Sequence, residues 1–273
     1  MKITILIPAI LLQSFAVIAA PHSRAQFCEL RKNPSYFIEQ ARDVTNHLAF
    51  SNYGGLFNGG VCWWHSLFQR ASLYLVVFRP ELSKPALTQA KLLIHSIAAG
   101  KRVIEIPGYS NMLDFSRDYE SLIQSKLEEW QKIDGFLKFA WIQGLSGSTS
   151  TSPDIIKRNI TQFHTLLTTQ YEIPWVMLQL KGIASHSILP VGINTTSIGV
   201  TIPHLDSNYI GRVLQFSYVF GERSLYTSGY GHFVPYLGRH SDFSYFYRAA
   251  NEYCSSEPKV VPPSEEVLSN HFD

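Results

Sequence analysis

The sequence predicts an α+β fold in which a helical lobe is followed by an antiparallel β lobe, with a cleft between the two. Apolar residues recur at helical spacing in the first part of the chain. After Pro174, short apolar segments separated by turn residues take over, as in strands. Because strands follow helices instead of alternating with them, we expect an antiparallel sheet, with the helical lobe at about 34–170 and the β lobe at about 174–250.

The composition is that of one globular domain. The chain has 273 residues, of which 45% are hydrophobic and 16% charged, enough for a sizeable core. The formal net charge of +2 gives no electrostatic reason to expect nucleic acid as a partner. We predict a single domain over 21–254 and a monomer.

The first residues have the pattern of a secretory signal peptide. A lysine near the start is followed by an apolar run that ends in small residues at Ala19 and Ala20. The alternative is an uncleaved membrane anchor, but Pro8 and Gln13 weaken a spanning helix and the run is short for one. We expect 1–20 to be removed, the mature protein to be periplasmic or secreted, and no stable membrane association after cleavage.

Spacing and turn residues place the elements in order. In the helical lobe, apolar periodicity predicts helices at 34–50, 62–78, 85–98, 115–141 and 154–169. A short strand is expected at 102–106 and polar loops are expected at 51–60 and 144–153. In the β lobe, strands are expected at 175–181, 186–193, 197–203 and 212–220, followed by aromatic segments at 232–237 and 243–247. The polar tail at 255–273 is expected to be poorly ordered.

The cysteine count bears on the chemistry. An exported protein favours disulfides, and three cysteines leave one thiol over. Cys28 and Cys254 lie near the two ends of the mature chain, and chain termini often lie close together. Pairing these two leaves Cys62 free; the alternative is that all three are reduced and buried.

Cys62 is the candidate nucleophile. It follows a Gly-Gly turn and opens a predicted helix, where the helix dipole favours a thiolate. A histidine that takes the thiol proton is also needed, and His186 begins an apolar strand. If the following hairpin is centred near Thr195, His186 lies opposite His204, and Asp206 is its diagonal neighbour. Asp206 is therefore the expected orienting acid.

Two segments resemble the papain-like cysteine peptidases. Residues 60–66 (GVCWWHS) are similar to the segment that opens their central helix, and 186–192 (HSILPVG) are similar to their histidine strand. The distance from Cys62 to His186 is close to the roughly 130–150 residues of that family. The resemblance implies a helical lobe and a β lobe, and a Cys62–His186–Asp206 triad that hydrolyses peptide or isopeptide bonds through a thioester, without a cofactor.

The chain also departs from the family. The glutamine that usually precedes the nucleophile and donates to the oxyanion is replaced by Leu56. Asn58 or Asn52 could substitute, with the backbone N–H of Cys62 as the other donor. The family's usual Asn-Ser-Trp-Gly block is absent, and 205–208 (LDSN) stands in its place, which makes Asn208 the alternative orienter. An aspartate there is similar to distant bacterial branches of the superfamily, including secreted peptidases.

Other functions remain open on the sequence. Cys62 and His65 have the spacing of half a zinc site, but no second ligand pair follows, so no metal is predicted. A transamidase would use the same triad as a peptidase. A non-catalytic binding or interaction protein on the same scaffold is the alternative from a different class. For the peptidase, the expected partner is a peptide or protein substrate.

Overall fold

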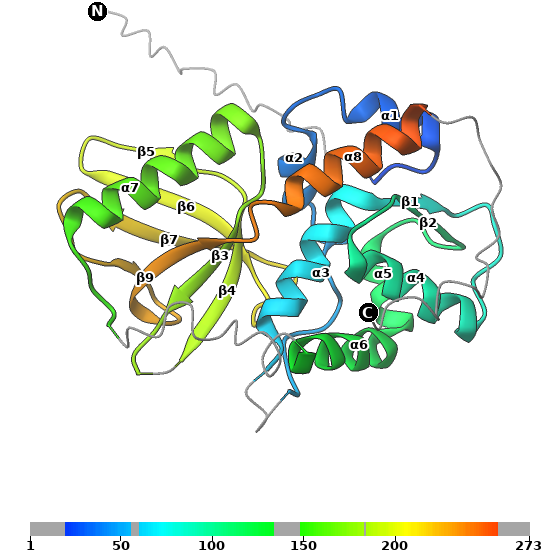
Figure 1. Ribbon diagram of the computed structural model, residues 1–273, viewed down its shortest axis with the longest axis horizontal. Coiled ribbons are helices and arrows are strands. Elements are labelled where there is room, and N and C mark those ends of the chain that lie inside the picture. The colour runs from blue at the N-terminus through cyan, green and yellow to red at the C-terminus, as the bar shows by residue number, and fades with distance from the viewer. Residues whose placement is uncertain (1–19, 56–59, 134–147, 183, 256–273) are drawn as a thin grey trace, which may run out of the picture.

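The computed structural model describes residues 20–55, 60–133, 148–182 and 184–255. It has a lobe of helices beside a lobe built from a β-sheet, as Figure 1 shows, so the predicted α+β class is confirmed. The predicted signal peptide lies outside the described residues except for Ala20. So do the predicted tail, except for Ser255, and residues 144–147 of the predicted loop at 144–153.

The helical lobe is made from the first part of the chain. Its helices are α1 (Arg24–Leu30), α2 (Tyr36–Arg42), η1 (Val44–Asn46), α3 (Cys62–Leu75), α4 (Leu87–Ala99), α5 (Met112–Asp118) and α6 (Glu120–Lys132). It also contains two parallel strands, β1 (Val76–Arg79) and β2 (Ile104–Pro107). Within the described ranges, no helix combines the length and apolar character needed to cross a membrane.

Helix α3 lies at the centre of the molecule, between the two lobes (Figure 1). It packs against α4, α6 and α8 on the helical side and against β3 and β4 of the sheet. Nearly all of its side chains are buried, and the core cluster extends from it into both lobes. The helix ends at Leu75 instead of continuing to 78 as predicted, because the β-branched Val76 and Val77 pair with β2.

The β lobe is a closed ring of strands. Its strands are β3 (Trp175–Gln179), β4 (Ser185–Pro190), β6 (Gly199–Asp206), β7 (Val213–Val219), β8 (Leu225–Thr227) and β9 (Gly231–Gly238). The pairing order is β4-β3-β9-β8-β7-β6, and a further β4–β6 pairing closes the ring, with the short β5 (Asn194–Thr195) added beside β6. Sequence reasoning missed β8, whose three residues give little periodic signal.

The β4–β6 register differs from the one predicted. Pro190, not His186, pairs with His204, and Ile188 pairs with Asp206, a shift of four residues. The turn closes later than expected, where Thr196 accepts hydrogen bonds from residues 198 and 199 and donates its own N–H to the Gly199 carbonyl. Because four is an even number, His186 and Asp206 stay on one face of the strands.

Residues 242–255 lie on the helical lobe and residues 153–164 lie on the β lobe, the reverse of the predicted assignment. Residues 243–247 are not part of the β lobe, because they lie in α8 (Asp242–Ser255), which runs back over the helical lobe to α1. Its buried residues follow helical spacing: Phe243, Phe246, Ala249 and Ala250. Conversely, α7 (Pro153–His164), which continues into the π-helical η5 (Thr165–Gln170), packs on β9 and covers the sheet (Figure 1).

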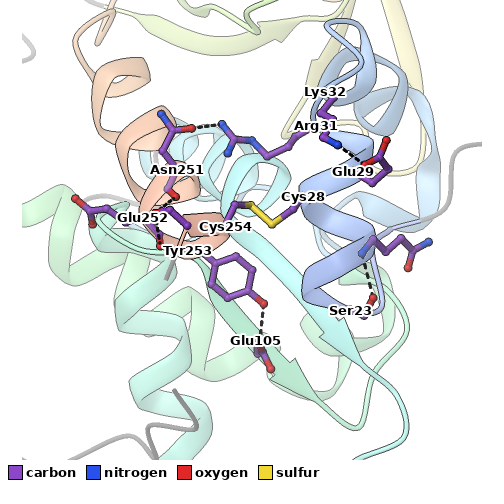
Figure 2. The surroundings of a disulfide bond; sticks show 12 residues. Ser23, Cys28, Glu29, Arg31, Lys32, Glu105, Asn251, Glu252, Tyr253 and Cys254 are labelled. Carbon is purple, nitrogen blue, oxygen red and sulfur yellow. Dashed lines mark hydrogen bonds and ion pairs between the residues drawn. A yellow bond between two sulfur atoms is a disulfide. The ribbon is translucent and has the colours of Figure 1, made fainter. Parts of the chain in front are cut away.

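A disulfide joins Cys28 of α1 to Cys254 of α8 (Figure 2). This is the pair that the sequence favoured. Beside it, the Arg31 guanidinium donates to the Asn251 side chain at 2.8 Å, and the Tyr253 hydroxyl donates to Glu105 at 2.6 Å. The returning C-terminal helix is thereby fastened to the start of the helical lobe.

Candidate active site

Cys62 is the first residue of α3 and the remaining free cysteine, with 6% of its surface exposed. The turn before it is held on two sides. The Gly60 carbonyl accepts a hydrogen bond from Gln131 of α6 at 2.9 Å, and the Val61 N–H donates to Oδ1 of Asn52 at 2.5 Å. Gly60 has a φ of +84°, which glycine adopts without strain, and this bend directs the chain into the helix.

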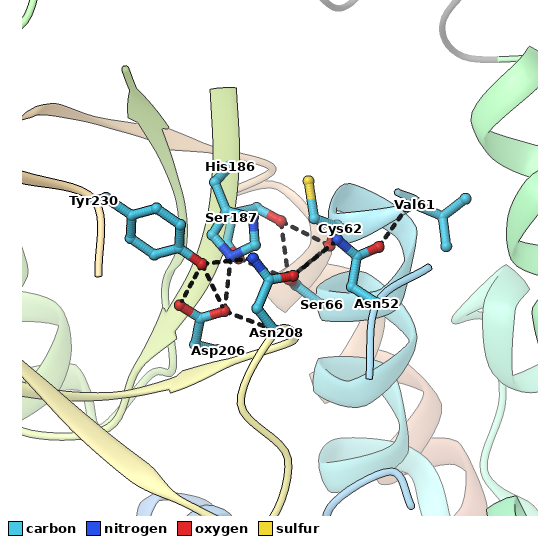
Figure 3. A network of polar contacts seen from close by, with 9 residues as sticks. All are labelled: Asn52, Val61, Cys62, Ser66, His186, Ser187, Asp206, Asn208 and Tyr230. Carbon is cyan, nitrogen blue, oxygen red and sulfur yellow. Dashed lines mark hydrogen bonds and ion pairs between the residues drawn. The ribbon is translucent and has the colours of Figure 1, made fainter. Parts of the chain in front are cut away.

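Two serines fasten Cys62 to the β lobe. Ser187 Oγ of β4 donates to the Cys62 carbonyl at 2.7 Å, and Ser66 Oγ lies 2.8 Å from both that carbonyl and Ser187 Oγ. Both serine side chains are buried. The helix that carries the cysteine and the strand that carries His186 are therefore joined one residue away from the histidine (Figure 3).

His186 contacts the aspartate predicted from the sequence. Its Nε2 donates to Oδ1 of Asp206 at 2.8 Å, and the exposed fractions of the two residues are 4% and 5%. Since Nε2 is used in this way, Nδ1 is the ring nitrogen left for Cys62, whose side chain is also a hydrogen-bond partner of His186. The structure thus brings the three predicted residues together where the lobes meet.

Asp206 is held by further donors. Its Oδ1 also accepts the backbone N–H of Asn208 at 2.8 Å, and the Tyr230 hydroxyl lies 3.1 Å from Oδ1 and 2.9 Å from Oδ2. The Tyr230 ring lies against the His186 ring, with centroids 4.8 Å apart and planes at 33°. Asn208, the alternative orienter, supports the aspartate instead of contacting His186 itself.

Burial and hydrogen bonds oppose each other in setting the charges. Burial lowers the pKa of His186, but the hydrogen bonds with Asp206 and Cys62 outweigh it and raise the pKa to about 10. Burial raises the pKa of Asp206, but the hydrogen bond and charge of His186 hold it below the ordinary value. Burial lowers the pKa of the neighbouring His65 and His204 to about 4. At neutral pH, His186 is therefore charged while these two neighbours are neutral.

Of the two oxyanion candidates, Asn52 lies at the site and Asn58 lies outside the described residues. The Asn52 amide nitrogen donates to Oδ1 of Asn208 at 3.1 Å, and the backbone N–H of Asn52 donates to the Ser207 carbonyl at 2.6 Å. Tyr230 was missed by sequence reasoning; it stands in the glycine- and aromatic-rich stretch 226–236 (YTSGYGHFVPY). The sequence signal for its role was weak, because nothing in that stretch distinguishes Tyr230 from its aromatic neighbours.

A cavity between the lobes reaches Asp206 from beside the site. Residues from both lobes line it, including His47, His65, Gln69, Leu189, Ser207 and Arg212. Neither Cys62 nor His186 lines this cavity, so it does not open onto the thiol. His65, one turn after Cys62, bonds through Nε2 to the Phe50 carbonyl at 3.0 Å.

Within the described ranges, no group of three or more His, Cys, Asp or Glu side chains is arranged to hold a metal ion. Comparison with known proteins gives no match to any protein-family model, curated protein or solved structure.

Proposed function

We propose that this chain is an exported cysteine peptidase that hydrolyses peptide or isopeptide bonds, with the lobe arrangement of the papain-like enzymes. The observation that carries the proposal is the convergence of Cys62, His186 and Asp206 through two successive side-chain contacts. A thiol beside an imidazole that is oriented by a carboxylate is the arrangement of an activated nucleophile. The disulfide between Cys28 and Cys254 fits export to an oxidising compartment.

In the proposed reaction, the Cys62 thiolate attacks the substrate carbonyl and forms a C–S bond. Protonated His186 gives its proton to the leaving amine as the C–N bond breaks, which leaves a thioester. Water then attacks this thioester, its proton passes to neutral His186, and the C–S bond breaks to restore the thiolate and the imidazolium. Asp206 keeps its charge throughout and holds the imidazole ring with Nε2 protonated.

The proposed oxyanion donors lie at the start of α3. The first N–H groups of a helix have no partner within the helix, so the Cys62 N–H is available to a developing oxyanion. The Asn52 amide lies beside this turn, and its nitrogen has a second hydrogen besides the one given to Asn208. Asn52 is therefore the proposed side-chain donor in place of the glutamine that Leu56 replaces.

The test is the rate at which iodoacetamide alkylates Cys62 near neutral pH. We expect Cys62 to react faster than a free cysteine peptide, and His186→Ala to lose this excess, because the imidazolium stabilises the thiolate. His164→Ala, which changes an exposed helical histidine, is the matched control. Labelling of the wild type no faster than the peptide would contradict the proposal. A panel of peptide and isopeptide substrates then identifies the bond, and added amines distinguish a transamidase from a hydrolase.

A second function is favoured by one observation. The cysteine, histidine and aspartate are all nearly buried, which restricts access of a substrate carbonyl to the thiol and favours binding without turnover. For such a binding protein, Cys62 would react slowly with iodoacetamide and with larger peptide-like alkylators alike.

A further inference from the structure

A series of hydrogen bonds between polar side chains, here called the hydrogen-bond chain, leads from the turn before Cys62 to the His186–Asp206 pair. It starts at the Val61 N–H, which donates to Asn52, and Asn52 donates to Asn208. Asn208 in turn donates through Nδ2 to the Tyr230 hydroxyl at 2.7 Å, and Tyr230 donates to Asp206. Figure 3 shows Asn52 and Asn208 between Val61 and the His186–Asp206 pair, with the Tyr230 hydroxyl pointing toward Asp206 from the other side.

The direction of the chain follows from its ends. A backbone N–H can only donate, so the atom of Asn52 that faces Val61 is the oxygen, and its nitrogen faces Asn208. Asn208 then accepts through Oδ1 and must donate through Nδ2 to Tyr230. The tyrosine hydroxyl therefore has its hydrogen free for Asp206, and a carboxylate can only accept. Every link is satisfied in one arrangement only, which orients all three side chains.

The chain crosses between the lobes. Asn52 belongs to the loop that precedes α3, whereas Asn208 follows β6 and Tyr230 lies between β8 and β9. It therefore connects the residue before the nucleophile to the acid of the opposite lobe, independently of the two serines that hold the Cys62 carbonyl. The sequence analysis predicted no residue of this hydrogen-bond chain to orient Asp206.

We propose that Asn52, Asn208 and Tyr230 are positioning residues that act as one unit, holding Asp206 and the Cys62 turn at a fixed separation so that His186 stays directed at the thiol. The proposal rests on the proposed function. Tyr230 both bonds the carboxylate and packs on the imidazole ring, so it fixes the two members of the pair together. The groups that face His186 are Cys62 and His65 of α3, His204 and Asp206 of β6, and Tyr230.

The test is a double-mutant cycle of Asn52→Ala and Tyr230→Phe. These two residues do not contact each other directly but are linked through Asn208 in the hydrogen-bond chain. The readout is the rate of iodoacetamide alkylation of Cys62, which forms no oxyanion and so does not report on Asn52 as an oxyanion donor. Each single variant should lower the rate at least about tenfold, the scale of a lost hydrogen bond to a charged group. The double variant should be no slower than the slower single, because one break already disables the unit. Additive losses, or unchanged single variants, would overturn the proposal.

Asn208→Ala interrupts the hydrogen-bond chain but keeps the hydrogen bond from its backbone N–H to Asp206. It should lower the alkylation rate of Cys62 as much as either single variant does. Two controls make the same chemical changes at exposed sites: Asn194→Ala in β5 and Tyr226→Phe in β8. Both should alkylate at the wild-type rate. An equal loss in the controls would show a general effect on the β lobe and sink the proposal.

A second readout is the titration of His186 followed by NMR in Tyr230→Phe. If Tyr230 positions the carboxylate, its removal loosens the His186–Asp206 contact and the pKa of His186 falls. If Tyr230 only shares the carboxylate charge, its removal strengthens the pull on the imidazole and the pKa rises, which would contradict the proposal. This measurement needs no reactive thiol. The NMR titration therefore still tests the hydrogen-bond chain if slow alkylation of wild-type Cys62 shows that the proposed function is wrong.

Discussion

Ser187 Oγ donates a hydrogen bond of 2.7 Å to the backbone carbonyl of Cys62. Cys62 is the proposed nucleophile, and Ser187 directly follows His186, the proposed base. The contact joins β4 to α3 without involving the thiol or the imidazole. Ser187, which takes no part in the proposed chemistry, therefore helps to hold the proposed nucleophile in place.

Ser187→Ala should lower both stability and thiol reactivity. It removes one of the two serine donors to the buried Cys62 carbonyl, and a single hydrogen bond contributes about 0.5–1.5 kcal/mol. We expect the free energy of unfolding to fall by that amount in urea titrations and the alkylation of Cys62 to slow. Ser244→Ala, at an exposed serine that bonds only locally, is the control and should change neither quantity.

Asp206→Asn should move the alkaline limit of hydrolysis to lower pH. His186 must be protonated to release the amine, and its pKa is raised to about 10, with Asp206 among the causes. Replacing the carboxylate by a neutral amide weakens that effect, so the imidazole loses its proton earlier as pH rises. The pH profile of kcat/KM for wild type and variant checks this. Identical alkaline limits would show that Asp206 does not hold the imidazolium.

Stability should fall on acidification because of two buried histidines. The pKa values of His65 and His204 are lowered to about 4 in the folded protein, against about 6.5 in the unfolded chain. Between these values the unfolded state binds more protons, so the free energy of unfolding decreases as pH falls through this window. Urea titrations at several pH values would show this slope, and His204→Phe should reduce it. A flat profile in the wild type would contradict the prediction.

Removing the disulfide should destabilise the protein without slowing the thiol chemistry. The Cys28→Ser, Cys254→Ser double variant loses a bond that closes most of the chain, a loss of about 2–5 kcal/mol. The bond lies between α1 and α8, away from the Cys62 turn, so alkylation of Cys62 in the folded variant should keep its rate. Guanidinium unfolding and labelling of the variant test the two halves separately. A large loss of reactivity would connect α8 to the site.

Gly60→Ala should be much more damaging than an equivalent change elsewhere. Gly60 has a φ of +84°, and an added Cβ would lie 2.4 Å from the Asn52 amide nitrogen. Gly211→Ala has a similar φ of +65° with no heavy atom within 4 Å of the added Cβ, so it isolates the backbone strain of about 1–3 kcal/mol. The excess loss at Gly60, in stability and in alkylation rate, reports the clash with Asn52. Equal effects at both positions would show that Asn52 gives way freely.

Much of the site could be predicted because its signals are local. A Gly-Gly turn before a helix indicated Cys62. Side chains alternate between the two faces of a strand, so a register that was wrong by an even number of residues still left His186 and Asp206 on the same face. Tyr230 and the bridging role of Asn208 could not be found in this way. Their partners are far away in the chain, and a side chain in a glycine-rich loop carries no periodic pattern.

The sequence by itself determined the α+β class and the succession of a helical part by antiparallel strands, and it indicated the disulfide pairing that leaves Cys62 free. These follow from hydrophobic period, turn residues and cysteine count, which act over a few residues or on the chain as a whole. Only the tertiary structure decided that the sheet closes into a ring, that 242–255 return to the helical lobe as α8, and that a polar chain joins Asn52 to Asp206. Those features depend on contacts between distant segments, whose geometry is set by packing and hydrogen-bond direction rather than by local preference.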